Sequence, residues 1–269
     1  MKIGKATIPE SAICTSDEDR IVVRGEDLCH ELIGHISFSD YFHLLVTGRR
    51  PDATASRVLE ATLVAIAEHG LVPSVQASRM TLAAAPDALQ GAVAAGILGC
   101  GSVILGASET AGRLFVRIDA LARERGVPLA DAATEVVREL RAAKQAIPGY
   151  GHPQHKARDP RVARLFEVAK AAGAPGRFVA IADTVEQVLP ALTGRDLRLN
   201  VSAAIPAVLL DVGFPVDALK GVPILARCAG LIGHLTEELQ HSIGFALSYQ
   251  ATREQRYTGE LPPVRGISW

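Results

Sequence analysis

A single short stretch, IPGYGHPQHKARDPR at residues 147–161, gathers most of the side chains that could do chemistry. Its histidines and basic residues are His152, His155, Lys156, Arg158 and Arg161. An imidazole titrates near neutral pH and can donate or accept a proton, while guanidinium and ammonium groups bind carboxylates and phosphates. The stretch therefore predicts a site in which an imidazole works beside a bound anion.

His152 stands between Gly151 and Pro153. Proline stiffens the backbone on one side, and glycine lets a ligand approach the backbone closely on the other. The imidazole could then be held as a proton donor or acceptor next to an anion. A loop histidine that bonds only to nearby backbone fits the same spacing, so both interpretations stay open.

The sequence Asp159-Pro160-Arg161 predicts the start of a helix. Aspartate is a favoured N-cap residue, and proline suits the first helical position, where its missing N–H costs nothing. Free N–H groups, the positive end of the helix dipole and the Arg161 guanidinium would meet there, which favours a carboxylate or phosphate. An arginine in a first turn can equally be solvated. Lys156 and Arg158, taken alone, are expected to be surface charges.

Arg227 lies in the stretch PILARCAGLIGHL, which is otherwise apolar except for His234. A cation in such a stretch has to be paired or bind an anion, which favours a functional role. His234 lies on the same helix face and is expected to be a core histidine with its hydrogen bonds satisfied.

Apolar residues recur with helical spacing along nearly the whole chain, which predicts an all-α fold of many helices joined by short Gly/Pro connections. Helices are expected around residues 59–66, 114–121, 162–169 and 225–239, the last with Leu225, Cys228, Ile232, Leu235 and Leu239 on one face. Alternation typical of a strand is found only in RIVVRG, residues 20–25.

Residues 88–108 carry no charge and are long enough to cross a membrane. The stretch is rich in glycine, and Asp87 and Glu109 flank it without a nearby basic residue. Glycine and alanine also favour close contact between helices. We therefore expect a buried or interface helix here, and no membrane as a partner.

Composition further narrows the kind of protein and the partners that it could bind. Of 269 residues, 48% are hydrophobic and 21% charged, so a sizeable core is expected. The net charge of −1 gives no general attraction for nucleic acid or an anionic membrane. Four scattered cysteines without a C-x-x-C pair predict neither a zinc site nor a disulfide framework. The first residues show no signal-peptide pattern, so a cytoplasmic location is expected.

Taken together, several segments resemble the citrate synthase superfamily. PGYGHPQHKARDPR is similar to its active-site loop, and IVVRGEDLCHELIGHISFSDYFHLLVTGRRP to its N-terminal segment. Further matches, in the family order, are EHGLVPSVQASR, GSVILGASETAGRLF, LRLNVSAAIPAVLLDVGFP, LARCAGLIGHLTEE and RYTGELPP. The chain most resembles the compact citryl-CoA lyase group, which is similar to the C-terminal module of ATP-citrate lyase.

The resemblance implies a multi-helical fold with a large and a small domain around a cleft, in a homodimer. Residues 1–105 and 214–269 would form the large domain and residues 106–213 the small one. The implied reaction cleaves or forms a carbon–carbon bond between an acyl-CoA such as acetyl-CoA and a 2-oxo acid such as oxaloacetate. The coenzyme A thioester would be the substrate, without a metal or redox cofactor.

The resemblance also assigns roles to particular residues. His152 matches the histidine that bonds the oxygen on the electrophilic carbon, and Arg161 and Arg227 match the arginines that hold substrate carboxylates. Lys156 matches a cation near the CoA phosphates. The loop whose backbone approaches the CoA adenine corresponds to Pro148, Gly149, Tyr150 and Gly151.

Two positions depart from the citrate synthase pattern. The histidine that polarises the thioester carbonyl is replaced by Ile104, as in the lyase-like members, which favours a lyase over a synthase. The aspartate that moves the acyl α-proton is replaced by Ser202, whose hydroxyl is too weak an acid or base to act in its place. A water held by Ser202, or Glu109 or His155, would have to substitute.

Three functions follow as alternatives. The chain is expected to be an active citryl-CoA-type lyase, or a relative acting on another 3-hydroxyacyl-CoA, with a citrate-synthase-type acyltransferase as a variant. It could instead be a non-catalytic binder of acyl-CoA or carboxylates, or an interaction subunit that keeps only the helical dimer. The cations and His152 argue against the third, because a scaffold has no use for a cationic pocket.

Overall fold

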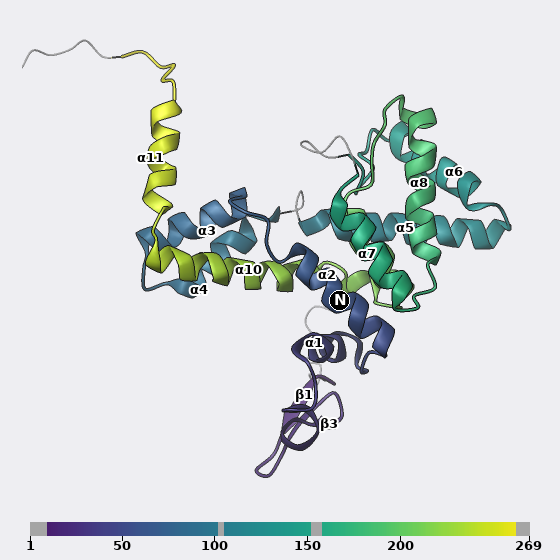
Figure 1. Cartoon of the computed structure of the whole chain (residues 1–269), viewed down its shortest axis with the longest axis horizontal. Helices are drawn as coiled ribbons and strands as arrows, with labels where there is room; N and C mark the ends of the chain where they lie inside the picture. The colour runs from purple at the N-terminus through teal and green to yellow at the C-terminus, as the bar shows by residue number, and fades with distance from the viewer. Residues whose placement is uncertain (1–9, 102–104, 152–157, 262–269) are drawn as a thin grey trace, which may run out of the picture. The chain divides into compact units, whose positions relative to one another are not determined.

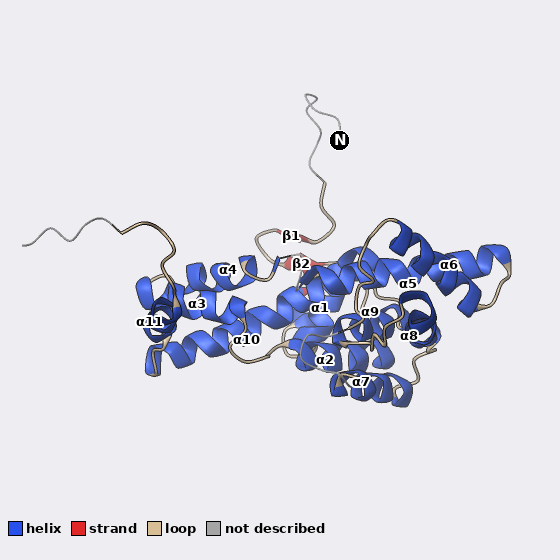
Figure 2. Cartoon of the chain, turned by 90° about the horizontal axis from the view of Figure 1, so that it is seen from above, coloured by secondary structure: helices blue, strands red, loops and turns tan. Residues whose placement is uncertain are grey.

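The computed structural model describes residues 10–101, 105–151 and 158–261. Helices dominate it (Figure 2), so the predicted all-α class is confirmed. The α-helices are α1 (Phe38–Thr47), α2 (Ala53–Ile66), α3 (Pro73–Ala84), α4 (Leu89–Leu98), α5 (Gly106–Arg125), α6 (Leu129–Ala142), α7 (Pro160–Ala171), α8 (Arg177–Thr193), α9 (Val201–Asp211), α10 (Gly221–Gln240) and α11 (Gly244–Glu254). Two short helical turns are η1 (Leu28–Leu32) and η3 (Val216–Ala218).

The expected strand is β2 (Ile21–Val23), and it is the middle strand of a three-stranded antiparallel sheet. Its neighbours β1 (Cys14–Ser16) and β3 (Glu26–Asp27) were not predicted. They are only three and two residues long and largely polar, so the strand propensity of their own residues is weak. Pairing with β2 makes them strands.

The helix signals in the sequence are confirmed in three places. α2 buries Leu59 and Ile66, and α5 buries Leu114 and Ile118 before ending at Gly126. α7 begins as predicted, with Asp159 as N-cap and Pro160 at the first helical position. The local sequence therefore sets where this helix starts.

The chain divides into two compact units, which are described separately. Unit 1 comprises Met1–Glu68 and Gly101–Arg227, and unit 2 comprises His69–Cys100 and Cys228–Trp269. The large- and small-domain boundaries implied by the resemblance are a different partition and stay a prediction.

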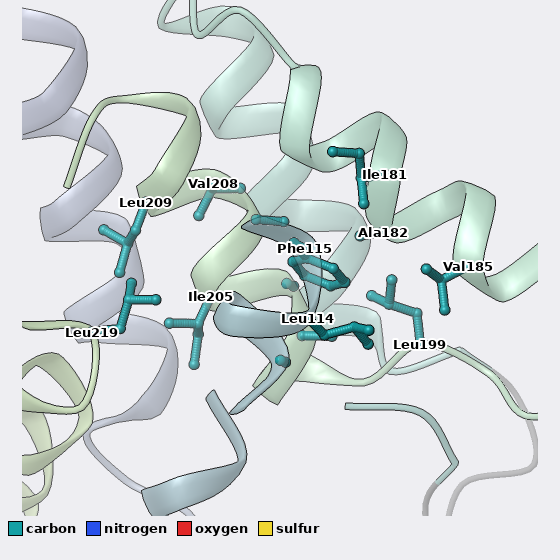
Figure 3. Packing of buried hydrophobic residues seen from close by; sticks show 14 of the residues in the cluster. Leu114, Phe115, Ile181, Ala182, Val185, Leu199, Ile205, Val208, Leu209 and Leu219 are labelled. Atoms are coloured by element: carbon teal, nitrogen blue, oxygen red, sulfur yellow. The ribbon is translucent and has the colours of Figure 1, made fainter. Parts of the chain in front are cut away.

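The core of unit 1 is aliphatic and lies where helices α2 and α5–α9 pack together. Phe115 of α5 is fully buried, and Figure 3 shows it near Ile181 of α8 and Ile205 of α9. Leu199, which precedes α9, is also fully buried in this core. The segment that leads into α9 is thus fixed from the apolar side.

Unit 2 contains α3, α4, the second half of α10, and α11 (Figure 1). The charge-free stretch does not form one long helix: α4 ends at Leu98, and α5 begins only at Gly106. Ala92 and Gly96 are buried, whereas Leu98 is 82% exposed, so α4 buries one face. A Cβ on Gly96 would lie 2.7 Å from Leu231 Cδ1, which explains the small residue there. Within the described ranges, no helix combines the length and apolarity of a membrane span.

The predicted apolar face of α10 is wrong at two positions. Ile232 is 50% exposed and Leu239 65% exposed, whereas the buried face carries Leu231, Leu235 and Glu238. A pattern of apolar residues cannot reveal this face, because it includes a charged side chain that is buried through pairing.

That pairing joins Glu238 of α10 to Arg79 of α3. Both side chains are nearly inaccessible, and Arg79 Nε lies 2.6 Å from Glu238 Oε2. Glu238 also accepts hydrogen bonds from Ser242 Oγ and from the N–H groups of Ile243 and Gly244, where α11 begins. Burial raises the pKa of Glu238, but these hydrogen bonds outweigh it and lower the pKa to about 2.

We predict that Glu238→Gln lowers the free energy of unfolding by about 3–5 kcal/mol, because the buried Arg79 guanidinium loses its buried charge partner and keeps only the exposed carboxylate of Glu237. Glu237→Gln is the control: Glu237 also contacts Arg79, but its side chain is 59% exposed, so the loss should stay below about 1 kcal/mol. Denaturant unfolding measures both, and equal losses would contradict the assignment.

The same pair predicts how stability depends on pH. The pKa of Glu238 falls from 4.5 to about 2 on folding, so the stabilisation is complete above pH 4.5 and is lost as the pH falls towards 2. The shift corresponds to about 3 kcal/mol. Melting temperatures between pH 6 and 2 should fall less steeply in Glu238→Gln than in the wild type.

Candidate functional site

The described part of the site lies where the loop at residues 148–151 meets the start of α9. Gly151 N–H donates to Arg198 O at 2.7 Å, and Asn200 N–H donates to Gly149 O at 3.0 Å. Tyr150 and Leu199 form an antiparallel bridge between the two segments. The loop is therefore bonded through its backbone to the residues that lead into α9.

Asn200 joins this pairing to the helix itself. Its side-chain oxygen caps α9 by accepting the N–H of Ser202 at 2.9 Å, and its Nδ2 donates to Gly151 O at 2.8 Å. One side chain thus fixes the loop and the first turn of α9 together. Ser202 is half-buried in this first turn, beside the predicted CoA-binding loop.

Gly149 allows the close approach between loop and helix. It has a φ of +84°, and a Cβ there would lie 3.0 Å from the Cα and N of Ala203 and nearer still to its Cβ. Only glycine fits both the backbone conformation and the space. The Tyr150 side chain points the other way: it is 8% exposed, and its hydroxyl donates to Ala182 O. Burial, with Glu186 and Asp183 nearby, raises the pKa of Tyr150 well above 10.

Arg161 lies in the first turn of α7, but the N–H group expected to bind an anion is already satisfied. Asp159 Oδ1 accepts the Arg161 N–H at 3.0 Å, and the same carboxylate holds the guanidinium through two further bonds of 3.0 and 2.8 Å. An incoming carboxylate would therefore meet a guanidinium already oriented by Asp159, with its side chain 24% exposed.

Asp159 also contacts the start of α9. Its carboxylate is 2% exposed. Burial raises the pKa of Asp159, but the hydrogen bonds from Arg161, with a smaller contribution from the nearby backbone N–H of Val201, outweigh burial and lower the pKa below its ordinary value. α7 and α9 pack against each other, and Arg161 and Ser202 lie in their respective first turns.

Several predicted site residues lie outside the described residues. His152, His155 and Lys156 fall in 152–157, and Ile104 in 102–104. Arg227 lies half-buried on α10. Glu109, which the resemblance offers as one substitute for an aspartate at position 202, accepts a hydrogen bond from the Arg113 guanidinium at 2.9 Å.

A cavity of about 500 Å³ borders the loop at Pro148. Its polar lining includes Arg113 and Arg117, one turn apart on α5, neither of which the sequence analysis singled out. The signal in the sequence was their spacing of four residues, which places both arginines on the same face of a helix. Arg113 bonds to Glu109 and Asp217, and Arg117 bonds to Glu139. Arg161 lines a separate groove of about 360 Å³ between α2 and α7.

Within the part of the chain that the structure describes, no group of three or more His, Cys, Asp or Glu residues could hold a metal ion. The described site brings together cations, backbone amides, the buried Asp159 carboxylate and the hydroxyl of Ser202.

A family model for the C-terminal domain of citrate synthase matches residues 37–244, which is more than half of the chain. The chain belongs to the citrate synthase family. The family predicted from the sequence is therefore confirmed.

Among solved structures, the citryl-CoA lyase of Hydrogenobacter thermophilus has a TM-score of 0.82 and 32% identity, covering 97% of this chain and 98% of that chain. An ATP citrate lyase of Methanosaeta concilii, solved with (3S)-citryl-CoA, has a TM-score of 0.73 and 26% identity, over 88% of this chain and 40% of that one. The citrate synthase of a Synechocystis species is 27% identical over 76% of this chain and 50% of its own length. The chain spans about half the length of the first curated relatives it matches.

We predict that Gly149→Ala destabilises the site more than an equally strained glycine replacement elsewhere. It combines a positive φ with overlap against Ala203, and such overpacking costs about 1–3 kcal/mol. Gly34→Ala is the control, with a φ of +83° and no atom within 4 Å of the added Cβ. Thermal unfolding of both variants measures the difference, and equal melting temperatures would contradict the close contact.

Proposed function

We propose that this protein is a carbon–carbon lyase of the citryl-CoA type, which cleaves a 3-hydroxyacyl-CoA into a shorter acyl-CoA and a 2-oxo acid. The observation that carries the proposal is the joining, through Asp159 and Asn200, of three segments: the 148–151 loop, the first turn of α7 with Arg161, and the first turn of α9 with Ser202. The full-length likeness to a citryl-CoA lyase supports the same reaction.

The proposed chemistry assigns one task to each residue. His152 takes the proton of the substrate hydroxyl as the carbon–carbon bond breaks, so that the oxygen becomes the carbonyl of the 2-oxo acid. The bonding electrons pass to the acyl-CoA, giving an enolate that must be protonated at its α-carbon. Arg161 and Arg227 hold carboxylates of the 2-oxo acid. A water held by Ser202 supplies the proton at the α-carbon.

Coenzyme A is proposed to lie along the loop at Pro148, Gly149, Tyr150 and Gly151, with Lys156 near its phosphates. Tyr150 turns its ring into the core, and Gly149 O, Gly151 N–H and Gly151 O are engaged by residues 198–200, so the proposal assigns recognition of an adenine edge to the other peptide groups of the loop. The cavity beside Pro148 adds Arg113 and Arg117 as further partners for a phosphate, which would compete with their present carboxylate partners.

A homodimer is proposed from the surface of unit 2. Its helices expose large apolar side chains, which a subunit interface would cover. These are Leu98, Ile232, Leu239, Phe245 and Tyr249.

The second candidate is a non-catalytic binder of acyl-CoA or carboxylates, and Ser202 is the observation that favours it. A protein that keeps the cations and the loop but lacks a carboxylate in the first turn of α9 could bind both substrates without turnover. The two functions can be told apart by adding citryl-CoA to the protein: a lyase consumes it, whereas a non-catalytic binder does not.

We predict that His152→Ala lowers kcat for cleavage of the acyl-CoA substrate by about 10²–10⁴-fold, the range for loss of a general acid–base group. His30→Ala, whose ring is 83% exposed on η1, is the control and should leave kcat unchanged. Release of acyl-CoA from citryl-CoA, followed by chromatography, measures both. A His152→Ala variant that stays folded and cleaves at the wild-type rate would refute this role.

We predict that Ser202→Asp raises the rate of citryl-CoA cleavage, because it restores a carboxyl group beside the acyl α-carbon. An aspartate in the first turn of a helix is also favoured by the helix dipole, so folding should survive. Ser202→Asn is the control. Asparagine has the size of aspartate but no carboxyl group, so this variant should give no gain. If Ser202→Asp gives no gain while calorimetry still shows CoA binding, the site serves a different substrate or none.

A further inference from the structure

One stretch of α8, residues 182–186, holds the two ends of the active-site loop and the start of α9. Ala182 O accepts the Tyr150 hydroxyl at 2.8 Å, before residues 152–157. Asp183 pairs with the Arg158 guanidinium, directly after them. Glu186 bonds to Leu199, two residues before α9. These contacts tie three separate segments to little more than one turn of a single helix.

Glu186 is the member that contacts two of the three segments. Its Oε1 accepts the Leu199 N–H at 2.6 Å, and its Oε2 lies 3.5 Å from the Arg158 guanidinium. The Glu186 side chain is 13% exposed, and Arg158 is further placed by the Phe166 ring, 5.5 Å from its guanidinium carbon. The carboxylate is therefore held from two directions.

The Leu199 N–H needs such an acceptor. Leu199 is fully buried, and a buried N–H without a partner costs free energy. The neighbouring N–H of Asn200 is taken by Gly149 O, and the Arg198 carbonyl by Gly151 N–H. Glu186 accepts the Leu199 N–H from the side of the segment opposite the loop. The backbone at 198–200 is therefore fixed between the loop and α8.

We propose that Glu186 is a positioning residue for the reaction, acting through its hydrogen bond to Leu199. By fixing residues 198–200, it sets where Ser202 and the Gly149–Gly151 backbone lie relative to each other. It has no assigned contact with substrate. The inference rests on the proposed function, because it is the cleavage reaction that depends on this placement. A displacement of about 1 Å at a reacting group can reduce a rate about 10²-fold.

The experiment compares three variants of the full chain. Glu186→Ala removes the acceptor, and we expect kcat for citryl-CoA cleavage to fall about 10²-fold while KM changes less than threefold. Glu186→Gln keeps an oxygen that can accept the Leu199 N–H but loses the charge facing Arg158, and kcat should stay within about threefold of the wild type. Glu167→Gln, at a 65% exposed carboxylate on α7, is the matched control and should leave kcat unchanged.

These outcomes separate positioning from a purely structural role. A structural residue would lower the melting temperature of Glu186→Ala without changing kcat per folded molecule, which would overturn the proposal. Equal losses of kcat in Glu186→Gln and Glu186→Ala would also overturn it, because the hydrogen bond would not be what matters. If Glu186→Ala does not fold, Glu186→Asp replaces it, and its shorter side chain should still reduce kcat more than tenfold.

Failure of the proposed function has a different result. In that case the wild type does not cleave citryl-CoA, whether or not it binds CoA, and amide hydrogen exchange tests Glu186 alone. Faster exchange at Leu199 and Ser202 in Glu186→Ala than in Glu167→Gln supports the placement of this backbone by Glu186. Unchanged exchange at both amides overturns it.

Discussion

The site depends on one buried carboxylate that serves two helices. Asp159 caps α7, holds the guanidinium of Arg161, and lies near the first N–H of α9, which helps to lower its pKa. Two helix N-termini carry partial positive charge, and with Arg161 they would repel one another without an anion between them. Asp159 supplies that negative charge, and its lowered pKa reflects the same attraction. The relative placement of Arg161 and Ser202 follows from this balance of charge.

Around this centre, the described site is rich in groups that can bind anions. Cations and backbone amides, which can bind anions and polar edges, belong to the loop, α5 and α7, whereas the first turn of α9 carries Ser202, where the resemblance implies an aspartate. Because Ser202 is uncharged, its side chain does not offset the positive end of the α9 dipole, as a carboxylate at this position would. A bound substrate carboxylate or enolate would therefore meet a more positive environment here than in a relative that has the aspartate. Under the proposed reaction, that environment would stabilise an enolate, whose α-proton would come from a bound water.

The sequence predicted features whose signal is local. Asp159-Pro160-Arg161 predicted the start of α7 because capping needs only neighbouring residues, and the helical spacing of apolar residues predicted the all-α class. The sequence did not reveal that Asp159 also lies near Val201, because this contact joins residues that are far apart in the chain. The buried face of α10 was mispredicted at Ile232 and Leu239, because Glu238 becomes a core residue only through Arg79. Arg113 and Arg117 were missed because paired surface arginines on a helix look like ordinary solvated charges.

The contact between Gly149 and Ala203 has a consequence for how this loop can change during evolution. The loop backbone at Gly149 lies directly on the first turn of α9. The size of the residue that fits at position 149 therefore depends on the residue at position 203, although the two positions are far apart in the sequence. A larger residue at either position would push the loop away from Asn200 and alter both binding and helix start together. Homologues should therefore vary these two positions jointly, and a library that randomises only one of them would sample mostly misplaced loops.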